Sequence, residues 1–274
     1  HAFGLEETGD HARAEEAGRA AVEANPRDCW AHHAVAHVME MQGRPAEGLA
    51  WITGREAHWA AEENFLKVHN WWHRALCHIE LDDPAAALAL FDGPVGGGVT
   101  AQDLVDAAAL LWRLDLVGVD VGDRWTSVSS AWELLADGKL YPFNDFHAAM
   151  AHLGAGRHDA VEAMLERMAG VGGCETADWI GRIGRPLVEG FAAFRAGRHR
   201  DAAERLWSAR HIVNAFGGSH AQRDVIDWTL TEAALRAGMA DVAAALAAER
   251  LALRPHSPVN RSFQSRARIL PAAA

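Results

Sequence analysis

The stretch GDHARAEEAGRAAVEANP, from Gly9 to Pro26, decides the fold because its small residues fall at fixed intervals. Gly9 is followed by Ala14, Ala21 and Pro26, at offsets of 5, 12 and 17 residues. A glycine accepts positive φ where a helix ends, and an alanine five residues later lets two helices approach closely. The stretch therefore predicts a turn followed by the second helix of an antiparallel pair.

The same spacing recurs along the chain. Further copies are Gly43, Gly48 and Arg55; Gly197, Ala202 and Ala209; Gly238, Ala243, Arg250 and Pro255; and, more weakly, Gly156, Val161 and Met168, and Asp82, Ala87 and Pro94. These are the offsets of a tetratricopeptide repeat of about 34 residues. We therefore predict an all-α, tetratricopeptide-like solenoid, a right-handed superhelix of about seven helix pairs.

The repeat register divides the chain into expected helices within one domain, residues 1–274. They cover 10–24, 28–42, 45–53, 66–81, 84–91, 101–117, 123–137, 143–155, 157–169, 177–196, 198–215, 219–237 and 240–253. Residues 54–64 form an insertion, and GPVGGGVT over 93–100 predicts a loop or hinge. Residues 255–274 are expected to cap the array and then fray.

The register also bears on the start of the chain. Counting back from Gly9 places His1 in the middle of the first helix of its repeat, and the chain has no initiator methionine. We therefore expect the sequence to be the C-terminal part of a longer protein. The opening helix should then expose apolar surface around Phe3 and Leu5.

Composition excludes several classes of partner. The net charge of −11 argues against nucleic acid. No apolar run has the length of a membrane span, so no membrane partner is expected. Cys29, Cys77 and Cys174 are odd in number and widely spaced, which favours free thiols in a reducing cytoplasm. Residues 182–274 carry 14 arginines against eight acidic residues, which indicates either an anion-attracting half or unselected surface charge.

Two predicted helices carry the candidate functional residues. CWAHHAVAHVMEMQGR, from Cys29 to Arg44, places His33, His37 and Glu40 at i, i+4 and i+7. VHNWWHRALCHIEL, from Val68 to Leu81, places His69 and His73 at i and i+4. Such spacing stacks side chains on one face of a helix.

In the repeat register these residues line the concave face. The expected lining is Trp30, His33, His37, Glu40, His69, Trp72 and, one step round, His73, with His147 further along. Three interpretations stay open. The histidines satisfy one another inside the superhelix; or His33, His37, His69 and His73 bind a divalent metal such as zinc; or the groove binds an organic ligand by tryptophan stacking and histidine hydrogen bonds.

A second candidate site follows the Gly217-Gly218 turn. Ser219 is expected to cap the next helix. His220 and Arg223 then have the chemistry to hold a carboxylate or phosphate at the helix start. The alternative is that Arg223 pairs with Asp227 on a solvated face.

Several motifs together resemble the tetratricopeptide repeat protein 38 family. They are HAFGLEETGD, WAHHAVAHVMEMQGR, HNWWHRALCHIEL, LVDAAALLWRL, GVDVGDRW, FNDFHAAM, FGGSHAQRDV and ERLALRPHSPVN. The resemblance runs from residue 1 to about residue 261 and implies an all-helical repeat fold without a settled activity. The sequence departs from it at Asp82-Asp83-Pro84, where the family usually has Gly-Asp, which predicts a more strained turn.

These observations support two functions of different classes. The first is a repeat protein that binds a small organic molecule or peptide partner in the histidine- and tryptophan-rich groove. The alternative is an enzyme, metal-dependent if the histidines are ligands, with its active site in that groove. The sequence assigns no catalytic residue.

Overall fold

The computed structural model describes residues 1–173 and 175–271, and every regular element in them is helical. The prediction of an all-α chain is therefore confirmed, whereas the superhelical solenoid stays a prediction. No helix in this described part has both the length and the apolar character needed to cross a membrane. Cys174 and the last three residues of the expected tail lie outside the described residues.

The chain divides into two compact units. The single helical-repeat domain expected over residues 1–274 stays a prediction. Unit 1 comprises residues 1–98 and 249–262, and unit 2 comprises residues 99–248 and the described residues from 263 onward. The first boundary falls at Gly96-Gly97-Gly98, because consecutive glycines do not sustain a helix. The expected loop starts later than residue 93, since Phe91–Val95 forms a π-helical turn around a non-helical Gly93.

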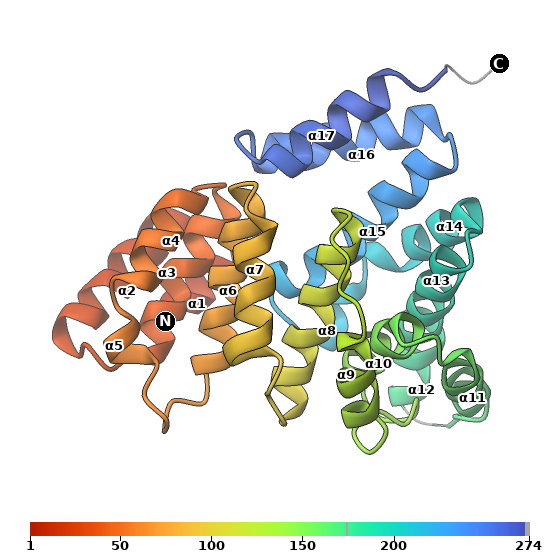
Figure 1. Ribbon diagram of the computed structural model, residues 1–274, viewed down its shortest axis with the longest axis horizontal. Helices are drawn as coiled ribbons and strands as arrows, with labels where there is room; N and C mark the ends of the chain where they lie inside the picture. Colours follow the sequence, from red (N-terminus) through yellow and green to blue (C-terminus); the bar gives the residue numbers. More distant parts are fainter. Residues whose placement is uncertain (174, 272–274) are drawn as a thin grey trace. The chain divides into compact units, whose positions relative to one another are not determined.

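Unit 1 is built from helices joined by short turns (Figure 1). They are α1 (Ala2–Glu7), α2 (His11–Ala24), α3 (Cys29–Met41), α4 (Pro45–Thr53), α5 (Glu56–Trp59), α6 (Lys67–Glu80) and α7 (Pro84–Leu90). α3 packs against α1, α2, α4 and α6 and is the centre of the unit. The start of α1 is partly covered, because Phe3 and Leu5 are half-buried rather than exposed.

Unit 2 contains the remaining helices. They are α8 (Ala101–Leu116), α9 (Arg124–Trp132), α10 (Pro142–Gly154), α11 (His158–Ala169), α12 (Glu175–Trp179), α13 (Arg185–Arg195), α14 (His199–Arg210) and α15 (His220–Arg236), with α16 (Ala240–Leu253) and α17 (Pro258–Arg268) shared between the units. The helix expected over 177–196 continues from α12 to α13 through a π-helical turn at Ile180–Gly184. The expected tail instead forms α17 over most of its length.

The six turn positions picked out by the repeat spacing share one backbone conformation. Their φ angles are 83° at Gly9, 66° at Gly43, 62° at Asp82, 73° at Gly156, 75° at Gly197 and 67° at Gly238. After Gly43, for example, the amide of Arg44 donates to the carbonyl of Met39 at 2.8 Å. That bond and the positive φ form the helix-ending motif typical of glycine.

The residues five positions after these turns allow the close packing that was predicted. Ala14, Ala87, Ala202 and Ala243 are each 0% exposed. At Gly48, an added Cβ would lie 3.1 Å from the Sγ of Cys77 on α6. Small residues at these positions therefore let neighbouring helices touch.

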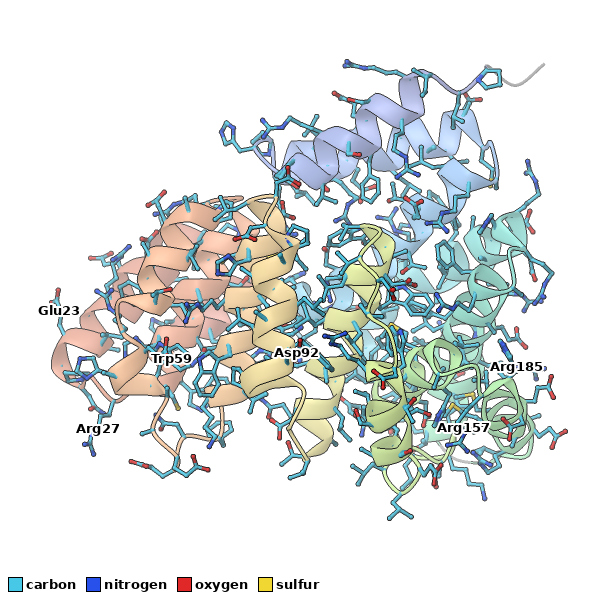
Figure 2. The ribbon with its side chains drawn as sticks, in the orientation of Figure 1. Glu23, Arg27, Trp59, Asp92, Arg157 and Arg185 are labelled. Atoms are coloured by element: carbon cyan, nitrogen blue, oxygen red, sulfur yellow. The ribbon has the colours of Figure 1, made fainter. Side chains whose placement is uncertain are left out.

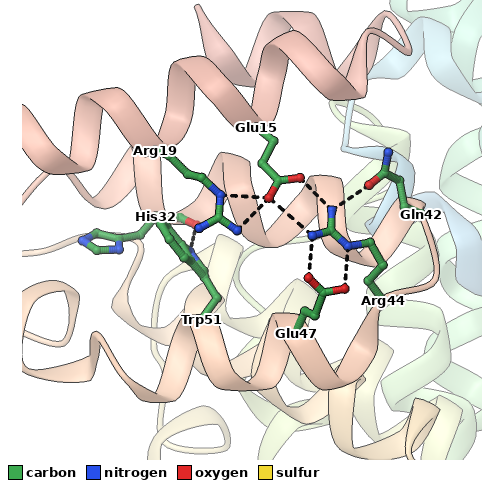
Figure 3. Close-up of polar contacts among 7 residues, drawn as sticks. All are labelled: Glu15, Arg19, His32, Gln42, Arg44, Glu47 and Trp51. Atoms are coloured by element: carbon green, nitrogen blue, oxygen red, sulfur yellow. Dashed lines mark hydrogen bonds and ion pairs between the residues drawn. The ribbon is translucent and has the colours of Figure 1, made fainter.

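A polar network connects α2 to the start of α4 on the outside of unit 1 (Figure 3). The carboxylate of Glu15 accepts a hydrogen bond from Arg44 at 2.6 Å, and Arg44 also binds Glu47 at 2.7 Å. Beneath it, the indole of Trp51 donates to the carbonyl of His32 at 3.1 Å. Glu23 and Arg27, by contrast, point away from the ribbon into solvent (Figure 2). The network therefore joins the start of α4 to α2.

Asp82 offers a direct test of the turn. It is the single described non-glycine residue with positive φ. A side chain strains that conformation, so Asp82→Gly is expected to raise the free energy of unfolding by about 0.5–1 kcal/mol. Urea denaturation measures the change. The reverse substitution at an equivalent open turn, Gly156→Asp, should lower it by about 1 kcal/mol; equal effects of one sign would contradict this account.

Candidate metal centre

Three helices of unit 1 bring four histidines together. α3 carries His33 and His37 one turn apart, and α6 carries His69 and His73 with the same spacing. α3 packs against α6 on one side and against the short α1 on the other. We call His33, His37, His69 and His73 the histidine cluster.

The cluster is compact and buried. Ring centroids lie 4.3 Å apart for His33 and His37, 4.4 Å for His37 and His73, and 4.8 Å for His33 and His69. Each histidine offers one ring nitrogen that lies within 4.8 Å of those of the other three. None of the four is more than 4% exposed. The predicted groove residues are thus brought together, but inside the unit rather than along an open surface.

One carboxylate orients an imidazole of the cluster, and a second lies nearby. Nδ1 of His73 lies 2.8 Å from Oε2 of Glu40, and we assign the proton to His73 as donor. A carboxylate that accepts from Nδ1 fixes the tautomer and leaves Nε2 as a lone-pair donor. Glu40 therefore prepares His73 to act as a ligand. Nδ1 of His37 lies 3.5 Å from Oε2 of Glu6, which is an ion-pair distance and not a hydrogen bond.

His33 is buried in the cluster without a hydrogen bond to its ring nitrogens. Neither of its ring nitrogens has a hydrogen-bond partner among the described residues, although the side chain is 3% exposed. Burial, reinforced by His37 and its other neighbours in the cluster, holds the pKa of His33 well below its usual value. A buried polar group left unpaired costs about 1–3 kcal/mol, so such a group calls for a partner.

Aromatic rings surround the cluster. Trp72 is fully buried and stacks on His69, with centroids 5.1 Å apart and planes at 14°. Phe3 of α1 stacks on His33 at 5.3 Å. Trp30 lies 5.6 Å from the His33 ring but is 47% exposed, so it borders the cluster rather than forming its core. These rings exclude water from most of the site.

Glu6 and Phe3 were missed as site residues. The repeat register nevertheless contains the signal, because Glu6 precedes Gly9 by the same three residues that separate Glu40 from Gly43. Phe3 likewise occupies the position that His37 occupies in the next repeat. Applying the concave positions to the opening repeat as well would have included α1 in the site.

The other predicted ligand-binding residues belong to unit 2. His147 on α10 is fully buried and donates through Nδ1 to the carbonyl of Phe143 at 2.7 Å. His220 is exposed at the start of α15. Arg223 donates to the carbonyls of Gly217 and Gly218, so it braces this turn. Asp227, the alternative partner of Arg223, also binds Arg210 at 2.8 Å.

His147 predicts a pH dependence of stability. Burial lowers its pKa to about 3, below the value of about 6.5 in an unfolded chain. The folded state therefore resists protonation, and stability present above pH 6.5 is lost as the pH falls toward 3. Between pH 7 and 5, His147 should contribute a loss of about 2 kcal/mol. Urea denaturation should show a smaller loss for His147→Leu; parallel pH profiles would refute the assignment.

The histidine cluster has a donor set suited to a transition metal. Imidazole nitrogens bind zinc, copper, iron and nickel, and four of them at tetrahedral corners suit zinc. Zinc–nitrogen bonds of roughly 2.0–2.1 Å require the four nitrogens to close in slightly from their present spacing. No protein-family model and no solved structure matches the chain.

Proposed function

We propose that unit 1 is a metal-binding module in which the histidine cluster holds one divalent ion of the zinc class. The observation that carries the proposal is that four buried imidazoles each place a ring nitrogen within 4.8 Å of those of the other three, while neither nitrogen of His33 has a hydrogen-bond partner among the described residues. An ion would supply that partner. It would also join α3 to α6, two helices that are separate in sequence.

Charge balance supports an ion at this position. The side chains of Glu6 and Glu40 are 0% and 9% exposed, and each faces a histidine of the cluster. Carboxylates beside the imidazoles attract a divalent cation to this position. The ligating nitrogens must be free of protons, so metal binding should release any proton that they carry.

The coordination favours a structural role for the ion. Four protein ligands complete a tetrahedral zinc site, whereas catalytic sites keep a position open for water or substrate. The adjoining cavity, lined by Glu40, Cys77, Glu80 and Arg254 among others, has a volume of about 10 Å³. That is room for about one water molecule. An enzyme function would therefore require one ligand to leave the ion.

We further propose that the scaffold is a tetratricopeptide-like solenoid related to the family that the sequence resembles. The six shared positive-φ turns and the buried small residues after them support this assignment. A cytoplasmic location is proposed with it. Cys29 and Cys77 are free thiols within the unit, in keeping with a reducing compartment.

A second candidate function is binding of an organic ligand or peptide beside the cluster. Trp30 and Phe65 favour it, because they are 47% and 57% exposed and their ring centroids lie 5.6 Å apart. Exposed rings next to a polar cluster suit stacking of an aromatic or amphipathic group. Such a ligand would meet these rings from outside the unit.

His33→Leu tests the metal site. Removing one of four ligands should weaken zinc binding by more than about 100-fold, the upper range for loss of an outer-shell partner. Competition with a chromophoric chelator measures the affinity of protein purified without a histidine tag. The matched control is His32→Leu, since His32 is also buried on α3 but binds the carbonyl of Pro26 instead. Equal affinities of the two variants would refute the site.

Glu40→Gln tests the orienting carboxylate. The amide keeps the shape of the side chain but removes the charge beside Nδ1 of His73, so zinc affinity should fall by about 10–100-fold. The control is Glu47→Gln, because Glu47 is exposed and binds Arg44 on the outside of the unit. The same chelator competition reports both variants. If Glu40→Gln binds zinc with unchanged affinity, the proposed role of Glu40 in orienting His73 is wrong.

A further inference from the structure

A second group of potential ligands adjoins the histidine cluster. Glu6, Glu7 and His37 each offer one ligand atom, and these atoms lie within 4.8 Å of one another. Glu6 is 1% exposed, and Glu7 is half-buried. The group combines two carboxylates with one imidazole, a harder donor set than the four nitrogens of the cluster.

His37 belongs to both groups, and its ring geometry lets it serve both. Its Nδ1 faces Glu6 at 3.5 Å. The two nitrogens of an imidazole have lone pairs that point in different directions from the ring, so each can bind a different ion. His37 therefore lies between the carboxylates of α1 and the other three histidines.

We propose that Glu6, Glu7 and Nδ1 of His37 hold a second divalent ion beside the ion of the histidine cluster. This inference rests on the proposed function, because Nε2 of His37 stays on the first ion. The second ion displaces the Nδ1 proton of His37, which is released to solvent. The resulting imidazolate bridges the two ions, and α1 becomes part of a dinuclear centre.

The charges of the surrounding residues favour this arrangement. Glu6, Glu7 and Glu40 bring three carboxylates to the same part of unit 1. The imidazolate adds a fourth negative charge when it forms. These charges attract a second divalent cation after the first ion has bound.

The test is a zinc titration of the full chain without a histidine tag, followed by calorimetry and by proton release in weakly buffered solution. We expect two ions per chain, the second weaker than the first and accompanied by release of a proton. Glu7→Gln should bind one ion with unchanged affinity at the first site. Glu16→Gln, an exposed residue on α2, should still bind two.

The outcomes separate the two proposals. A chain that binds one ion overturns the second site and leaves the first intact. A chain that binds none overturns both. Two ions in Glu7→Gln would place the second ion elsewhere on this acidic protein and would also overturn the inference. Circular dichroism of each variant verifies that the helices are retained, because Glu7 is only half-buried and its amide should fold.

Discussion

Within each unit, the packing of successive helices depends on one constraint, which is a residue with positive φ at the end of a helix. Each such turn ends one helix, reverses the chain, and fixes where the next helix begins. The small residue five positions later then decides how closely the two helices pack. In unit 1 these turns follow Glu6, Glu40 and Ile79 by three residues. The turns thus set the position along each helix axis at which the inward-facing side chains lie.

Burying the histidine cluster costs desolvation free energy, which packing alone does not explain. Helical packing alone would be served by leucine or alanine at these positions. Instead, four imidazoles and two carboxylates are buried between α1, α3 and α6, where their polar atoms lose contact with water. Buried polar groups that cost desolvation free energy without improving packing often belong to functional sites. The proposed cation would account for both the nitrogen donors and the carboxylates.

Unit 2 shows the same residue types in a different role. His147 is buried but donates to a backbone carbonyl one turn earlier on its helix. The guanidinium of Arg113 is also buried and donates to the carbonyl of Ala221 at 2.8 Å, which joins α8 to α15. These bonds support packing, although Nε2 of His147 has no hydrogen-bond partner among the described residues. Residue type alone therefore does not separate a ligand from a structural side chain; the histidine cluster differs because four ring nitrogens meet there.

The sequence by itself determined the all-helical class, most helix boundaries, the six turn positions and the spacing of histidines on α3 and α6. These features are local, since they depend on glycine at positive φ and on helical periodicity. The tertiary structure alone decided that the four histidines meet inside unit 1 and not along an open surface, that His147 belongs to unit 2, and that the chain forms two units. These depend on which faces of distant helices meet, and spacing within one helix does not encode that meeting.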